Sequence, residues 1–388
     1  MARGGRTGWN RRLSGPPLEV RVSETRYLLF ISVCPGLEDL LLEEVEDILP
    51  GVKVSKREAG VEARVSASEI WSIARRTRMG ETMRVRVGRF KATRYESLME
   101  GLDRMAWAAY VPRGAVPPVQ ITCRKSRLSN PAAVKSRLQA LLRARTEGIP
   151  ATVAEPVLSI RLYKDRATIS VDAGGEPLYK RGYQEEKAPD TLRETLAAAC
   201  VRAAAIDPLQ TVWDPFCGSG TIPIESVFVA PDADFTLAGR RFAFECWPTH
   251  DADAYAAATS SVRGDAGRRA FGSDVNLDEI RVAEADALRA GVEAECTFIR
   301  GDFESVASQI PEGSAVLSNL PYGRGLPTQE LHEVFARFGA MLRERRDLNP
   351  VVVLDGTSSL EDATGCRGES LRRFSNEGVW VTMMQLVR

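Results

Sequence analysis

The chain has 388 residues, 44% hydrophobic and 27% charged, and its 52 basic side chains are balanced by 52 acidic ones. This length predicts two or three domains, and no apolar run approaches the roughly 18 to 20 residues that a membrane helix needs. Seven cysteines without a CxxC pair and only two histidines argue against a disulfide framework, a metal site and a His-based triad, so we expect an intracellular, cytoplasmic protein.

The neutral total conceals a charge asymmetry along the chain. Residues 1–190 carry 33 Lys and Arg against 23 Asp and Glu, whereas residues 191–388 carry 19 against 29; over 75–145 the excess is steepest, 17 against 4. A basic half of this kind suits a polyanion such as RNA, with a solvated basic face as the alternative. We expect the basic, Gly- and Pro-rich segment 1–22 to be a disordered arm, or else an organellar transit peptide.

The segment 23–185 has a mixed α+β pattern. A buried strand is predicted at 26–34, and Pro35 and Gly36 then precede a helix with apolar residues at helical spacing. The elements expected next are strands at 52–57 and 61–66, a helix at 67–79, a strand at 83–90, a helix at 94–103, a strand at 118–124, a helix at 131–145, and strands at 157–163 and 167–173.

The junction before the helix at 131–145 suits phosphate. Asn130 is placed to cap the helix, and Pro131 fits its first position because it lacks an N–H. Cations between a strand end and a helix start lie beside free N–H groups and the positive end of the helix dipole. We therefore assign RNA binding to Arg124, Lys125, Arg127, Lys135, Lys180 and Arg181.

The segment 186–388 alternates strands and helices. Thr191 to Glu194 has the form of a capping box ahead of an Ala-rich helix. Strands are expected at 211–215, 269–274, 296–300, 314–319 and 350–355, helices at 220–230, 276–290 and 328–346, and a hairpin across 371–387. This alternation predicts a doubly wound parallel sheet with its ligand site at the carboxyl ends of the strands.

A glycine-rich turn, DPFCGSGT, spans 214–221 at the first of these strand ends. Gly218 and Gly220 permit a tight turn and close backbone approach to a ligand. The string lacks the GxGxxG pattern of dinucleotide sites and the Lys of a P-loop. It therefore favours a ligand with an amino-acid end and a ribose, although a plain strand–helix turn is the alternative.

Acidic residues close the next two strands. Asp274 could accept both hydroxyls of a ribose, and Asp302, followed by Phe303, could hold and cover an adenine. Either carboxylate alone could be a helix cap. Together with Asp214 they form a series at three consecutive strand ends, which favours a nucleoside-bearing ligand.

The fourth strand ends in SNLPYG, residues 318–323. An exocyclic base amine is a poor nucleophile, and two acceptors that hold its N–H groups can direct its lone pair at a methyl donor. Asn319 Oδ1 and the Leu320 carbonyl suit this role, Pro321 fixes the turn, and Tyr322 offers a face for an extruded base. The alternative is a simple turn, for which Asn, Pro and Gly are also suited.

These motifs resemble known families over about 23–388. DPFCGSGT, the GSD and GD strand ends and NLPYG resemble the class I methyltransferases of exocyclic amines, and SRLSNPAAVKSRL, ISVDAGGEPLYKRGY and APDTLRETLAAA are similar to THUMP-domain RNA guanine-N2 methyltransferases. WDPFCGSGT, RRFAFECWP and FSNEGVWV are similar to the N-terminal enzyme half of the large bacterial 23S ribosomal RNA methyltransferase.

The resemblance implies an α/β protein with a ferredoxin-like segment and THUMP RNA-binding domain at 23–185 and a Rossmann-like, seven-stranded methyltransferase domain at 186–388. It implies S-adenosyl-L-methionine as cofactor and assigns the target base to Asn319, Leu320, Pro321 and Tyr322. The implied cofactor residues are Thr195, Asp214, Phe216, Cys217, Gly218, Gly220, Thr221, Asp274, Asp302, Phe303 and Asn319.

The predicted reaction is methyl transfer to N2 of a guanosine in large-subunit ribosomal RNA. Leu320 stands where the family usually has Pro, which weakens the ribosomal assignment more than the reaction. The alternatives are guanine N2 in tRNA, an adenine or protein amide, and an RNA-binding assembly factor whose donor pocket is inactive.

Overall fold

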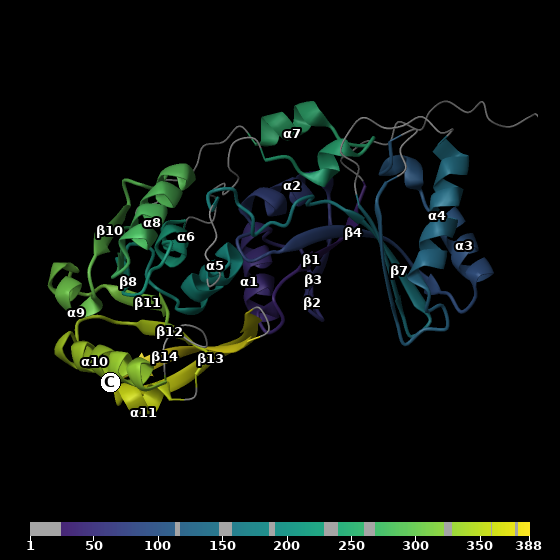
Figure 1. The fold of residues 1–388 in the computed structure, drawn as a ribbon. Helices are drawn as coiled ribbons and strands as arrows, with labels where there is room; N and C mark the ends of the chain where they lie inside the picture. Colours follow the sequence, from purple (N-terminus) through teal and green to yellow (C-terminus); the bar gives the residue numbers. More distant parts are fainter. Residues whose placement is uncertain are drawn as a thin grey trace, which may run out of the picture.

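The computed structural model describes residues 25–112, 117–146, 157–185, 191–228, 240–259, 268–321, 328–357, 359–376 and 379–388. The predicted arm at 1–22 and Tyr322 lie outside these ranges. Within them the chain forms two seven-stranded sheets, each with helices packed around it (Figure 1).

The N-terminal sheet has the strand order β2-β3-β1-β4-β7-β6-β5 and is antiparallel except for the β5–β6 pair. Asn130 caps α4 as predicted, because its Oδ1 accepts a hydrogen bond from Ala133 N at 3.1 Å. The elements are β1 (Tyr27–Ser32), α1 (Glu38–Ile48), β2 (Val54–Arg57), β3 (Gly60–Val65), α2 (Ala67–Arg76), β4 (Thr82–Lys91), α3 (Tyr95–Asp103), η1 (Trp107–Ala109), β5 (Val119–Arg124), α4 (Pro131–Thr146), β6 (Leu158–Tyr163) and β7 (Arg166–Asp172).

The C-terminal sheet has the order β10-β9-β8-β11-β12-β14-β13, parallel except at β14 and β13. Its elements are α5 (Glu194–Ala203), β8 (Val212–Asp214), α6 (Thr221–Val227), η2 (Ala243–Cys246), α7 (Ala252–Ala258), β9 (Ala270–Asp274), α8 (Leu277–Ala290), β10 (Cys296–Arg300), α9 (Phe303–Val306), η3 (Ala307–Gln309), β11 (Ala315–Asn319), α10 (Thr328–Glu344), β12 (Val351–Asp355), α11 (Leu360–Thr364), β13 (Arg367–Asn376) and β14 (Val379–Val387). The strand order reverses between β8 and β11, where ligands bind in doubly wound sheets.

One local prediction is wrong. The Ala-rich helix α5 begins at Glu194 with Arg193 as its N-cap, and no side chain caps it. Thr191 therefore lies three residues before the helix begins and does not form the predicted capping box.

The two halves share one apolar core. Leu29 and Ile31 of β1 belong to the same buried cluster as Leu196 of α5 and Phe374 of β13. In Figure 1, α5 lies beside α1, and α7 lies over α2. No helix among the described residues is both long and apolar enough to span a membrane.

The segment 240–259 packs against the N-terminal half, although it follows the sequence boundary at 186. The ring centroids of Tyr255 and Trp71 of α2 are 5.4 Å apart, and those of Trp247 and Tyr110 are 5.2 Å apart. Part of the chain that follows the predicted boundary therefore packs against the residues that precede it.

Candidate active site

The carboxyl ends of three adjacent strands bring Asp214, Asp274 and Asn319 to one edge of the C-terminal sheet. β8 ends at Asp214, β9 on one side ends at Asp274, and β11 on the other ends at Asn319. This is the edge at which the sequence predicts the donor and the target base.

The glycine-rich turn is tied to the end of β9. Gly218 N donates a hydrogen bond to Asp274 Oδ2 at 3.1 Å, and Cys217 N donates to the Ser273 carbonyl at 3.0 Å. Gly220 has a φ of 78°, and a Cβ there would lie 2.8 Å from the Phe298 ring. The position therefore requires glycine for both its backbone conformation and its close packing.

Asp214 is a buried carboxylate. Its Oδ1 accepts hydrogen bonds from Ser318 Oγ at 2.6 Å and from Phe216 N at 3.0 Å. Burial raises the pKa of Asp214 to about 7 in spite of these two bonds, and the charge of Asp274 acts in the same direction. Ser318 had no predicted role, and its place in the SNLPYG motif was its one signal in the sequence.

Asp274 also closes the turn into α8 by accepting from Asn276 N at 2.9 Å. Glu279, on the first turn of that helix, lies close to the glycine turn, because a Cβ at Gly218 would be 3.8 Å from its Oε2. Burial and then the charges of Asp274 and Asp278 raise the pKa of Glu279. No sequence motif marks this carboxylate, because its placement depends on the packing of α8.

Asp302 has partners of its own. It caps α9 by accepting from Glu304 N at 3.0 Å, and it forms an ion pair with Arg337 of α10 at 2.5 Å. Burial alone would raise the pKa of Asp302, but the hydrogen bonds from Arg337 and from the amides of Ser305 and Glu304 outweigh it and lower the pKa.

Phe303 is buried and packs with two other rings. Its ring centroid lies 5.3 Å from that of Phe216 and 5.6 Å from that of Phe338. The predicted adenine contacts of Asp302 and Phe303 would therefore be made beside an ion pair and a packed aromatic cluster.

Two of the residues predicted to bind the cofactor have a buried side-chain oxygen that makes no hydrogen bond within the described part of the chain. These oxygens are Asn319 Oδ1 and Thr195 Oγ1. A buried polar atom without a partner is costly, so each points to a group that the described residues do not supply. Thr221, another predicted donor residue, has a protein partner: its Oγ1 accepts from Gln184 Nε2 at 2.7 Å.

Leu320 has a structural role beyond the proposed carbonyl contact. Its side chain is buried in the cluster that contains Phe335 and Phe338, and its N–H donates to the Leu354 carbonyl of β12 at 3.3 Å. Pro321, the next residue, is half-buried. Tyr322, the predicted stacking residue, lies outside the described residues, so its placement stays a prediction.

The predicted RNA-binding cations are exposed with one exception. Exposed side chains are found at Arg124, Lys125, Arg127, Lys135 and Lys180. Arg127 N donates to Asp165 Oδ1 at 2.8 Å, which ties the β5–α4 junction to the β6–β7 turn.

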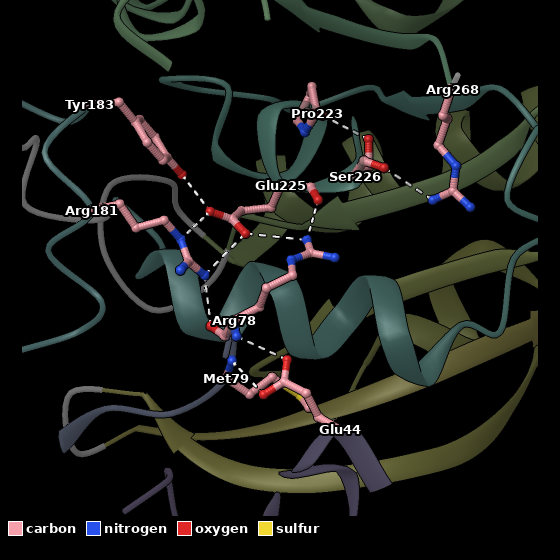
Figure 2. A network of polar contacts seen from close by, with 9 residues as sticks. All are labelled: Glu44, Arg78, Met79, Arg181, Tyr183, Pro223, Glu225, Ser226 and Arg268. Atoms are coloured by element: carbon pink, nitrogen blue, oxygen red, sulfur yellow. Dashed lines mark hydrogen bonds and ion pairs between the residues drawn. The ribbon is translucent and has the colours of Figure 1, made fainter. Parts of the chain in front are cut away.

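Arg181 is the exception, and its assignment to the RNA surface is wrong. Its side chain is buried, and its Nε donates to Glu225 Oε1 of α6 at 2.6 Å. The same carboxylate accepts from Tyr183 at 3.0 Å and forms an ion pair with Arg78 of the N-terminal half at 3.2 Å (Figure 2). Phosphate cannot reach a guanidinium that is enclosed in this way.

Glu225 therefore joins both halves through buried charges. Arg181 Nη2 also donates to the Arg78 carbonyl at 2.7 Å, and the backbone N–H of Arg78 donates to Glu44 of α1 at 2.9 Å (Figure 2). The network ends on α6, the helix that begins at the glycine-rich turn. It thereby links the helix after the glycine-rich turn to the N-terminal half.

Comparisons with known proteins agree with this geometry. A family model described as the RMKL-like methyltransferase domain matches residues 181–384. The chain belongs to this family. The solved structure of SMU.472, a methyltransferase-like protein in complex with SAH, is 22% identical, with a TM-score of 0.81 over 94% of this chain and 98% of that one. TrmN from Thermus thermophilus is 21% identical, with a TM-score of 0.68 over 93% and 99%.

Relatives by sequence cover most of the chain. YpsC of Bacillus subtilis (strain 168), named as a candidate RNA methyltransferase, is 26% identical over 90% of this chain and 93% of its own length. The ribosomal RNA large subunit methyltransferase K/L of Chromohalobacter salexigens is 28% identical over 90% of this chain but only 50% of its own length. The chain thus spans about half of that enzyme. These findings and the strand order confirm the predicted α/β methyltransferase fold.

Proposed function

We propose that the protein is an S-adenosylmethionine-dependent RNA methyltransferase that acts on an exocyclic base amine, N2 of a guanosine in large-subunit ribosomal RNA. The observation that carries this proposal is the buried Asn319 Oδ1, which has no hydrogen-bond partner among the described residues. Asn319 ends β11 and follows Ser318, whose hydroxyl donates to Asp214. The names of YpsC and of the K/L enzyme support an RNA substrate.

The residues present fit the donor. The unpartnered Thr195 Oγ1, the glycine turn with positive φ at Gly218 and Gly220, and the carboxylates of Asp214 and Asp274 would surround its amino-acid and ribose ends. The bound cofactor would supply a methyl group on a cationic sulfur, which leaves as a neutral thioether. An anionic Asp214 in a buried setting favours a nearby cation.

The chain's own residues position the base. Asn319 Oδ1 and the Leu320 carbonyl would each accept one N–H of the amine and so direct its lone pair at the methyl group of the donor. As the N–C bond forms and the S–C bond breaks, the amine would release one of its two protons to solvent. Positioned acceptors of this kind act on the developing charge of the transition state. Tyr322 is proposed to stack on the extruded base.

The test is methyl transfer from labelled S-adenosylmethionine to separated ribosomal RNA and tRNA, followed by nucleoside analysis. Methylguanosine from large-subunit RNA is the expected product. Label only in tRNA would move the substrate and leave the reaction in place, and donor binding without transfer to any RNA would favour the assembly-factor alternative.

A further inference from the structure

The hairpin of β13 and β14 extends the sheet beyond the edge that carries the site. Asp355, the last residue of β12, lies opposite Thr382 of β14, which runs antiparallel to β12. The residues of β14 that precede Thr382 therefore continue past the carboxyl end of β12. Asn319 lies opposite Leu354 of β12, so this overhang and the proposed base site share one edge of the sheet.

An exposed indole lies on the overhang. Trp380 is 58% exposed, whereas its neighbour Val381 is fully buried. Because side chains alternate along a strand, Trp380 shares a face with Thr382 and Met384, and Met384 packs on the cluster that includes Phe338 of α10. Trp380 thus lies on the α10 face, the face on which Leu320 is buried.

A cation accompanies this ring. Arg373 lies opposite Thr382, and its guanidinium carbon is 5.2 Å from the centroid of the Trp380 ring. Both side chains are exposed, so the hairpin presents an arginine and an indole together at its surface.

The hairpin is held against the N-terminal half. Cys34 Sγ donates to the Ser375 carbonyl at 3.3 Å, and a Cβ at Gly36 would lie 2.2 Å from the Arg373 carbonyl. Such close backbone approach fixes the outer part of the hairpin where the two halves meet. A platform held in this way needs little ordering when a ligand binds.

We propose that Trp380 and Arg373 form a platform for a single-stranded nucleotide adjacent to the target base, with the base stacked on the indole and the guanidinium paired with a phosphate. The inference rests on the proposed RNA substrate. Aromatic faces and arginine are the usual means of holding single strands without reading their sequence. Trp380 is displaced from Asn319 in two directions. Across the sheet it lies two strands away, about 10 Å, and along the strands it lies three residues further out, about 10 Å. A nucleotide next to the target base can span this separation.

The first test measures methyl transfer to purified ribosomal RNA. Trp380→Ala should raise the KM for RNA roughly ten- to a hundred-fold, as expected for one lost stacking contact, and leave kcat and the affinity for S-adenosylmethionine unchanged. Trp380→Phe should retain most of the wild-type KM. Leu209→Ala is the matched control, because Leu209 is 75% exposed on the segment before β8, at the opposite edge of the sheet.

The second test does not depend on activity. Photocrosslinking to ribosomal RNA containing 4-thiouridine, mapped by mass spectrometry, should label the peptide that contains Trp380, and Arg373→Gln should reduce that label while Arg373→Lys keeps more of it. If the wild type binds RNA, Trp380→Ala has an unchanged KM and no protein is labelled at this peptide, the platform is wrong and the proposed function stands. A wild-type protein that neither binds nor methylates RNA would remove the proposed function as well.

Discussion

At the scale of single residues, the buried carboxylate of Asp214 is predicted to make donor binding dependent on pH. Its pKa is about 7, so it is mostly protonated at pH 6 and mostly ionised at pH 8. A cationic donor favours the ionised form, and its affinity should therefore rise about ten-fold as the pH rises from 6 to 8. Calorimetry of S-adenosylmethionine binding across this range measures the effect.

Asp214→Asn is the control for that titration, because the amide has nearly the same shape but does not ionise. Its donor affinity should be weak at pH 8 and show no rise between pH 6 and 8. Equal slopes for the wild type and for Asp214→Asn would assign the titration to another group, for which Glu279, a carboxylate with a raised pKa beside the glycine-rich turn, is the candidate.

Asn319 offers a test of the chemical step. Asn319→Ala should bind donor and RNA nearly as the wild type does but lose roughly two to three decades of single-turnover rate, because one positioned acceptor is worth a few kcal/mol of barrier. Asn130→Ala is a matched change outside the site: it removes the α4 cap, with a stability cost of about 1 kcal/mol, and should keep the rate. A full rate in Asn319→Ala would show that this turn has only a structural role.

At the scale of elements, the β5–α4 junction is predicted to hold phosphate. Replacing Arg124, Lys125 and Arg127 with Ala should weaken binding of all RNAs and flatten the dependence of affinity on salt, since each lost phosphate contact lowers the slope by a little under one. Filter binding from 50 to 300 mM salt (roughly the range in which such slopes are resolved) measures both effects, and donor affinity should not change.

The control for this change removes the same charge elsewhere. Arg269, Arg281 and Arg346 are exposed side chains of the other half, and their replacement with Ala alters net charge equally. If both triple variants flatten the slope to the same extent, overall charge and not the junction governs RNA binding.

Local patterns predicted most of the elements. Apolar periodicity and end signals such as Asn130 and the glycine turn act within a few residues, so the strands and the longer helices begin and end near their predicted positions. The short helices α7, α9 and α11 span too few turns for a period to show. The carboxyl-edge placement of Asp214, Asp274 and Asn319 also followed from strand–helix alternation.

Contacts between distant segments could not be predicted in this way. Arg181 looked like one more surface cation, because its partner Glu225 is 44 residues away and belongs to another element. Leu320 stands where the family usually has Pro, and the sequence could not show that its N–H bonds to β12 or that its side chain is buried. Both features depend on tertiary packing, which determines which side chains are exposed.

At the scale of the whole molecule, a fixed arrangement of the N-terminal and C-terminal halves would set the distance between RNA bound to the first and the cofactor bound to the second. The shared apolar core and the Glu225 network both oppose relative motion, which domains joined by small polar interfaces usually retain. The network also connects the N-terminal half to a defined element, because the Glu225 carboxylate lies on α6, the helix that directly follows the glycine-rich turn.

Glu225→Gln should disturb this relation. The change removes the buried charge that Arg78 and Arg181 share, and loss of one partner from a buried ion pair typically costs about 3–5 kcal/mol of unfolding free energy. At a temperature where the variant is still folded, kcat for RNA should fall about ten- to a hundred-fold, because small misplacements of a reacting group are costly. RNA affinity should stay near the wild-type value.

Glu62→Gln is the control that shows whether Glu225→Gln misplaces the glycine-rich turn or only lowers the stability of the protein. Glu62 is also a buried carboxylate with arginine partners, Arg86 at 2.9 Å and Arg57 at 3.0 Å, but all of them lie within the N-terminal sheet. It should lower stability, by less than Glu225→Gln because Arg57 remains half exposed, and leave kcat per folded molecule unchanged. Urea unfolding combined with single-turnover kinetics on both variants decides the matter: an equal fall in kcat would mean that Glu225 acts on stability alone and does not position the donor loop against the RNA.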